Sequence, residues 1–159
     1  LLVNGPAERW SPLTETLLMY ASRRDHVERV IVPALERGAV VLSDRFHDST
    51  RAYQGAGGGA APELIAALET YCLGSVRPDL TLIMDLPVSV GLARAMGRGG
   101  AEARFESKGE AFHEKLRQGF ADIAAAEPER CRLINADQTP DELEALIWDL
   151  VQPALAAQS

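Results

Sequence analysis

Residues 39–55 read AVVLSDRFHDSTRAYQG, an apolar run followed at once by a dense polar segment. The apolar run is short, continuous and rich in β-branched residues, which is typical of a strand covered on both faces of a parallel sheet. We therefore predict a buried strand over residues 39–44. The polar segment then falls at the carboxyl end of that strand, where open parallel sheets bind their ligands.

The rest of the chain alternates between helical and strand-like patterns. Apolar residues three and four apart predict helices over residues 13–35, 62–73, 89–96, 112–126 and 140–155. Two more apolar runs predict buried strands over residues 80–86 and 131–137, and the glycines of residues 55–59 predict a loop. Helices that alternate with buried strands imply an α/β fold, with a parallel sheet of three strands and helices on both faces. We expect one domain, residues 1–159.

Composition and charge narrow the class of protein. The 159 residues are 47% hydrophobic and 25% charged, which is ordinary for a globular domain. The formal charge of −7 argues against a nucleic-acid or anionic membrane surface, because either would need a concentrated basic face. No apolar run approaches the ~20 residues of a membrane helix. The two cysteines lack metal-ligand spacing, and we expect reduced thiols in a cytoplasmic protein.

Asp44 and Arg45 directly follow the predicted strand. An aspartate in this place suits the orientation of Mg²⁺ in phosphoryl transfer, and an arginine can bind phosphate oxygens with two parallel hydrogen bonds. On these two residues alone, a solvated ion pair that ends the strand is the favoured interpretation, because matches this short are common by chance.

The next residues, Ser49, Thr50, Tyr53 and Gln54, offer hydroxyl and amide groups. If a helical turn begins near Asp48, Ser49 and Tyr53 share one face and so do Thr50 and Gln54. Polar side chains in this arrangement could form hydrogen bonds with the edge of a base and with a ribose. The alternative is a helix cap followed by an exposed turn.

The segment DRFHDSTRAYQG resembles the signature region of the thymidylate kinases, which phosphorylate dTMP to dTDP with ATP. The resemblance continues in order through LLMYASRRDHVERVIVPALERGAVVLSDR, RPDLTLIMDLPVSVGLARA and the RFES and FHEKLRQGF segments. It covers essentially the whole chain, and a motif of this length with matching flanks is specific. The resemblance implies a P-loop NTPase-like sheet, ATP with Mg²⁺, and a homodimer formed through helices.

The resemblance also implies roles for single residues. Arg45 would hold the dTMP phosphate, and Arg23 would read an oxygen on the thymine edge. Thr50 and Gln54 would lie at the base, with Ser49 and Tyr53 close around the nucleotide. Asp44 would help to orient Mg²⁺ through water. The family's aromatic residue that stacks on thymine aligns with Met19, one residue before Tyr20, so either residue could fill that role.

Residues 95–108 are glycine-rich and charged, and they resemble the family's lid. Arg98 and Arg104 would stabilise the charge that develops on the transferring phosphate when the lid closes. A solvated surface loop is the alternative for this composition.

The chain departs from the family in one large respect, because no G-x-x-x-x-G-K-[ST] motif occurs in it. We therefore expect a fragment that lacks the family's first strands and its phosphate-binding loop, carries the dTMP-accepting half of the site, and is inactive alone. Two alternatives stay open: another P-loop nucleoside or nucleotide kinase, and a non-catalytic fragment that binds nucleotide.

Overall fold

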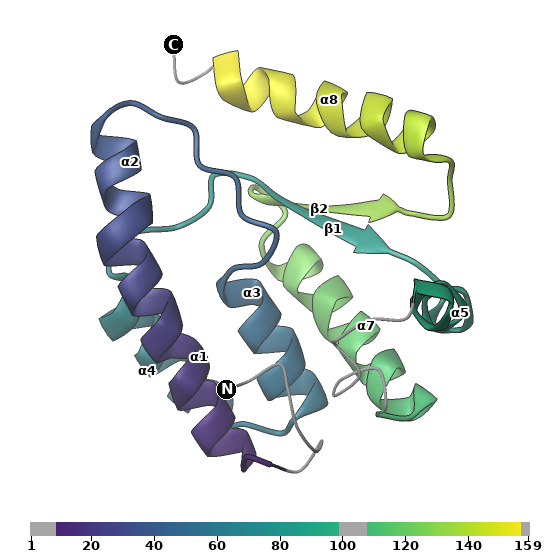
Figure 1. The fold of residues 1–159 in the computed structure, drawn as a ribbon, viewed down its shortest axis with the longest axis horizontal. Coiled ribbons are helices and arrows are strands. Elements are labelled where there is room, and N and C mark those ends of the chain that lie inside the picture. Colours follow the sequence, from purple (N-terminus) through teal and green to yellow (C-terminus); the bar gives the residue numbers. More distant parts are fainter. Residues whose placement is uncertain (1–8, 99–107, 157–159) are drawn as a thin grey trace.

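The computed structural model describes residues 9–98 and 108–156, without the side chains of residues 96–98. Helices dominate it, as Figure 1 shows. In chain order the elements are α1 (Pro12–His26), the π-helical η1 (Val27–Ile31), α2 (Val32–Glu36), α3 (His47–Thr50), the π-helical η2 (Arg51–Gly57), α4 (Pro62–Leu73), β1 (Thr81–Asp85), α5 (Val88–Arg98), α7 (Glu110–Ala126), β2 (Cys131–Asn135) and α8 (Pro140–Ala156). Among the described residues, no helix is both long and apolar enough to cross a bilayer.

The sheet consists of β1 and β2 in parallel. Their register runs from Thr81 opposite Cys131 to Asp85 opposite Asn135. Figure 1 shows α7 and α8 on opposite sides of these two strands. Ile83 and Ile134 are 7% and 3% exposed, whereas Met84 and Leu133 are 44% and 48% exposed, so the helices cover the sheet only in part. The predicted parallel α/β arrangement, with helices on both faces, is confirmed for this part of the chain.

The predicted strand over residues 39–44 is wrong. Residues 39–46 are extended or irregular and pair with no other strand in the described part of the chain. Val40 is 67% exposed and Leu42 is 97% exposed, although the apolar pattern predicts burial on both faces. A strand needs a hydrogen-bonded neighbour, so an apolar run without one stays an exposed segment. The described sheet therefore has two strands instead of three.

The long N-terminal helix predicted over residues 13–35 is present as α1, η1 and α2 in succession. Ser11 caps its start, because its Oγ accepts from the Thr14 backbone N–H at 3.2 Å. Gly38 ends it with a φ of 72°, a left-handed conformation that glycine adopts most easily. The π turn lies just before Pro33, whose ring cannot follow a regular α turn without a clash.

Helix α4 has the bounds that the apolar pattern predicts, and the apolar residues Ile65, Leu68 and Cys72 pack in the core as their spacing requires. Its buried residues are Ile65, Glu69 and Leu73. Tyr71, an apolar residue of the same helix, is the exception, because it is 83% exposed. The buried face packs against α1 and η1, where Tyr20 and Ile65 belong to one apolar cluster and Val27 belongs to another with Leu73.

The glycines predicted as a loop instead lie partly in η2, which runs to Gly57. Helix α7 packs closely on η2 at Gly119, where an added Cβ would lie 2.6 Å from the Ala56 Cβ. This contact needs a residue without a side chain. It holds η2 against the layer that also covers the sheet.

Candidate functional site

The polar segment of residues 47–57 forms one short helical unit, α3 followed by η2. A helical turn is what the pairing of Ser49 with Tyr53 requires, and α3 begins at His47, one residue before Asp48. In η2 the turn widens to a π-helix, a rare geometry that often occurs at functional sites.

A cavity of about 550 Å³ lies between residues 39–46, β1 and the C-terminal part of α8, and most of the residues that line it are apolar. Four of the predicted site residues line it, namely Asp44, Arg45, Ser49 and Tyr53. The Arg45 guanidinium carbon lies 5.0 Å from the centre of the Tyr53 ring, within cation–π range. The charged end of the segment and its aromatic residue therefore lie beside one cavity, with Asp44 and Arg45 exposed to incoming ligands.

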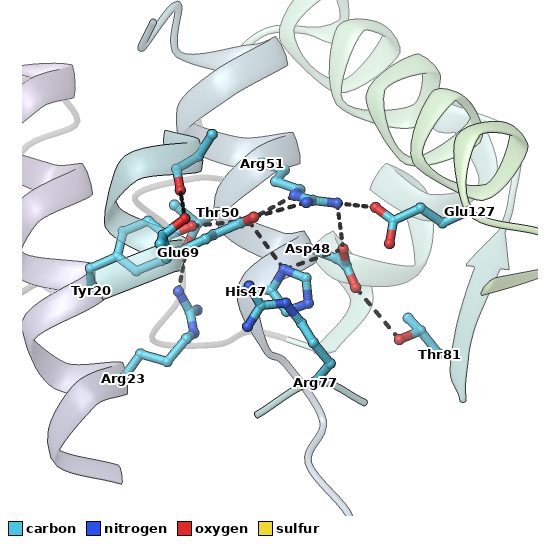
Figure 2. A network of polar contacts seen from close by, with 12 residues as sticks. Tyr20, Arg23, His47, Asp48, Thr50, Arg51, Glu69, Arg77, Thr81 and Glu127 are labelled. Atoms are coloured by element: carbon cyan, nitrogen blue, oxygen red, sulfur yellow. Dashed lines mark hydrogen bonds and ion pairs between the residues drawn. The ribbon is translucent and has the colours of Figure 1, made fainter. Parts of the chain in front are cut away.

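Arg23 and Thr50, both predicted to read the base, are in direct contact. Arg23 Nη1 donates to Thr50 Oγ1 at 2.8 Å, as Figure 2 shows. The guanidinium also lies over the rings of Tyr20 and Phe46, at 5.4 and 5.6 Å. Burial lowers the pKa of Arg23 below the ordinary arginine value, although a guanidinium stays charged at neutral pH.

Gln54 is 2% exposed and does not line the cavity. Its Nε2 donates to Oε1 of Glu15 at 2.7 Å. Glu15 is 6% exposed and belongs to the first turn of α1. Sequence reasoning missed this carboxylate, because nothing in the local pattern relates residues that are so far apart.

Met19 and Tyr20 lie in different environments. Tyr20 is 1% exposed, packs in the core, and donates from its hydroxyl to Glu69 Oε1 at 3.2 Å. Its burial and then the nearby Glu69 charge raise the pKa of the phenol. Met19 is half-buried and follows Glu15 by one helical turn. Of the two, Met19 has the side chain on the face of α1 that carries Glu15 and Arg23.

Glu69 is the centre of a buried ionic network that sequence reasoning missed. Figure 2 shows α1, α3, η2 and α4 contributing to it. Arg51 donates to both Glu69 oxygens at 2.7 and 2.8 Å, and His47 Nδ1 lies 3.1 Å from Oε1. Burial alone would raise the pKa of Glu69, but the hydrogen bonds from His47 and Arg51 outweigh it and hold that pKa at about 2.

The network continues from α3 to the edge of the sheet. Arg130 donates to both Asp48 oxygens at 2.7 and 2.8 Å and to Thr81 Oγ1 at 2.9 Å. Its Nε also donates to Glu127 at 2.7 Å, and Arg51 is bonded to the same carboxylate. We call α3 and η2 together, residues 47–57, the polar wall. These contacts join the polar wall to Thr81, the first residue of β1, and to the turn before β2. The wall is therefore held from both sides.

One signal in the sequence points to this network. Glu69 lies four residues from both Ile65 and Leu73, so it shares the apolar face of its helix. A charged residue on a buried face needs a partner, because an unpaired buried charge is very costly. The identity of the partners could not be read from the sequence.

Three comparisons place this geometry among known proteins. The sequence model of the family described as Thymidylate kinase matches residues 2–147. The chain belongs to the thymidylate kinase family. Among curated relatives, the thymidylate kinase of Caulobacter vibrioides is 67% identical over 151 residues, covering 95% of this chain and 72% of the relative. The thymidylate kinase of Bradyrhizobium sp. strain ORS 278 is 48% identical over 157 residues, covering 98% and 70%.

A solved thymidylate kinase structure shares the fold. The crystal structure of the Ehrlichia chaffeensis protein superposes with a TM-score of 0.64 at 33% identity, covering 84% of this chain. This chain spans 59% of that protein's chain. The likeness identifies the two-stranded sheet and its helices as part of a P-loop NTPase-like thymidylate kinase fold.

Most of the predicted lid, residues 95–108, lies outside the described residues. Arg104 lies outside the described residues, and so does the side chain of Arg98, the last residue of α5. Within the described ranges, no group of three or more acidic, histidine or cysteine side chains could hold a metal ion. Asp44 has an exposed carboxylate, and a carboxylate oxygen is a ligand of the kind that binds hydrated Mg²⁺.

Proposed function

We propose that this chain carries the acceptor site of a dTMP kinase, which transfers the γ-phosphoryl group of ATP to dTMP and forms dTDP. The main support is one observation: a family match over residues 2–147 coincides with a polar segment whose side chains lie at one cavity and against α1. The chain covers only part of the length of its relatives, so we propose the complete reaction for the whole protein.

Arg45 is the proposed ligand of the dTMP phosphate. Its guanidinium is exposed at the cavity beside Tyr53. A guanidinium can bind two phosphate oxygens in parallel, and stacking on a ring restricts its plane. Ser49 lines the same cavity and would contact the nucleotide with Tyr53.

Arg23 and Thr50 are the proposed readers of the thymine edge. Thr50 Oγ1 accepts a hydrogen bond from Arg23, which leaves the Thr50 hydroxyl able to donate to another acceptor. Together the two residues offer donors, which match the C4 carbonyl of thymine and oppose the C4 amino group of cytosine. Gln54 and the half-buried Met19 would complete the contacts with the base.

Asp44 is the proposed carboxylate that orients Mg²⁺ through water. A metal held there would supply charge neutralisation to the phosphates of ATP in the proposed in-line transfer. Arg98 and Arg104 remain the predicted residues that stabilise the transferring phosphoryl group. We also propose a cytoplasmic homodimer, joined through the outer faces of α1 and α4, where Leu13, Leu17 and Tyr71 are exposed.

The activity can be tested in a chimera that joins this chain to the remaining residues of the Caulobacter vibrioides relative. We expect ADP release from Mg·ATP to be fastest with dTMP, slower with dUMP and dCMP, and absent with thymidine. Arg45→Ala should raise KM for dTMP at least tenfold, because an arginine–phosphate contact is charge-assisted. A preference for thymidine would overturn the proposal in favour of a nucleoside kinase. No turnover with any acceptor would favour the alternative of a non-catalytic nucleotide-binding fragment.

A further inference from the structure

Two polar pairs join α1 to the wall formed by α3 and η2. One is Arg23 with Thr50, and the other is Glu15 with Gln54. Glu15, Met19 and Arg23 are four residues apart, so they lie on one face of α1. The Glu15–Gln54 pair therefore lies along the same buried contact between α1 and the α3–η2 unit as the proposed base-reading pair, Arg23 and Thr50.

The carboxylate determines how the Gln54 amide is turned. A carboxylate only accepts hydrogen bonds, whereas the two ends of an amide differ, one donating and one accepting. The bond of 2.7 Å therefore requires the amino end of Gln54 to face Glu15. With Gln54 2% exposed and Glu15 6% exposed, water cannot easily replace the partner, so the carbonyl end is also fixed in direction.

The direction of an amide matters for the choice between pyrimidines. Thymine presents an N3–H donor beside a C4 carbonyl acceptor, and cytosine presents an N3 acceptor beside a C4 amino donor. An amide that is free to turn over can pair with either edge. An amide held in one direction pairs well with one edge and leaves unpaired groups against the other.

We propose that Glu15 is a positioning residue that makes this site select thymine over cytosine by holding the Gln54 amide in one direction. The inference rests on the proposed dTMP site, and it adds a residue that does not itself contact the base. A purely structural role is the alternative, since an acidic residue in the first turn of a helix is favourable anyway. The two roles differ in what Glu15→Gln changes.

The first test compares dTMP and dCMP by isothermal titration into the unaltered chain and Glu15→Gln. In the variant the two amides can pair in either direction, so Gln54 can turn over. We expect the ratio of dTMP to dCMP affinity to fall about tenfold or more, mainly because dCMP gains affinity. Glu63→Gln is the matched control, because Glu63 is exposed on α4 and the charge change is the same. It should leave the ratio unchanged.

The second test exchanges the two side chains in the double variant Glu15→Gln and Gln54→Glu. This variant keeps a buried amide–carboxylate hydrogen bond, so the urea midpoint should return close to that of the unaltered chain. The base would then meet a carboxylate, which only accepts, and the preference for dTMP should not return. Recovery of both the midpoint and the dTMP preference would contradict the inference.

Other outcomes of the two tests also distinguish a positioning role of Glu15 from a purely structural role. If Glu15→Gln weakens dTMP and dCMP by the same factor, or changes neither, Glu15 has only a structural role and the inference is wrong. If the unaltered chain does not prefer dTMP, the proposed function itself fails. That failure is visible before any substitution is made.

Discussion

Residues 39–46 and residues 47–57 are consecutive in the sequence, yet their structural support differs. The first segment is apolar at its start, exposed at Val40 and Leu42, and pairs with no strand in the described part of the chain. The second is polar, largely buried, and bound through ion pairs and hydrogen bonds to α4, to α1 and to the turn before β2. Apolar character alone does not make a strand, and a polar segment becomes rigid when distant residues satisfy its charges.

Residues 47–57 and residues 39–46 would therefore contribute to the proposed site in different ways. The helical wall can position nucleotide contacts before a ligand arrives, which reduces the ordering cost of binding. The segment that carries Asp44 and Arg45 has less support, although the stacking on Tyr53 gives Arg45 one fixed neighbour. Substitutions that disturb the contacts of residues 47–57 should therefore cost more stability than substitutions in residues 39–46.

Glu69→Gln should have the largest effect, because it removes the charge from a carboxylate that is bonded to Arg51, His47 and Tyr20. Breaking one partner of a buried ion pair costs roughly 3 kcal/mol or more. We expect urea unfolding to show a loss of that order. Glu63→Gln on the exposed side of the same helix is the control and should change little. A Glu69→Gln loss below that of the control would show that the network does not hold the wall.

Acidification should remove the same stabilisation. The pKa of Glu69 is about 2 in the folded protein against an ordinary 4.5, so its contribution is complete above about pH 5 and is lost as the pH falls toward 2. The linked free energy is on the order of 3 kcal/mol. Urea unfolding between pH 7 and pH 3 should show the unaltered chain and Glu69→Gln converging at low pH. A constant difference would contradict the assignment.

Gly119→Ala should have a smaller effect, because its new methyl group would lie 2.6 Å from the Ala56 Cβ. Overpacking of this kind costs about 1–3 kcal/mol. Ala56→Gly in the same chain should restore most of the loss, because it removes the opposing methyl group. Urea midpoints of the two single variants and the double variant measure the coupling. Additive losses would mean that α7 and η2 do not meet at this point.

Leu42→Ser should have the smallest effect. Leu42 is 97% exposed, and substitutions at such positions usually change stability by less than about 0.5 kcal/mol. Thermal and urea unfolding should give curves that overlay those of the unaltered chain. A clear loss of stability would show that residues 39–46 are packed in solution, and it would weaken the contrast with the helical wall.

The sequence predicted the elements whose cause is local. Helix α4 has the predicted bounds, and β1 and β2 fall within the predicted runs, because spacing and breakers act over a few residues. The strand prediction for residues 39–44 was wrong because strand formation depends on a partner elsewhere in the chain. The ionic network was missed for a similar reason: Arg130 and Asp48 are 82 residues apart.

The candidate site was predicted in part. Ser49 and Tyr53 line one cavity with Arg45, as expected from residues that share a helical face at the end of the apolar run. The sequence left Met19 and Tyr20 as alternatives, and the structure adds that Tyr20 is buried in the core whereas Met19 is half-buried. Glu15 could not be found from the sequence, since its importance lies in the direction of one hydrogen bond to Gln54.

The central claim is that this chain presents a dTMP-accepting site supported by the buried network. Its most direct test is isothermal titration of dTMP and of thymidine into the unaltered chain, repeated with Arg45→Ala. The account predicts saturable binding of dTMP, at least tenfold weaker binding of thymidine, and loss of that difference in the variant. Equal affinity for dTMP and thymidine in the unaltered chain, or no binding of either, would contradict it.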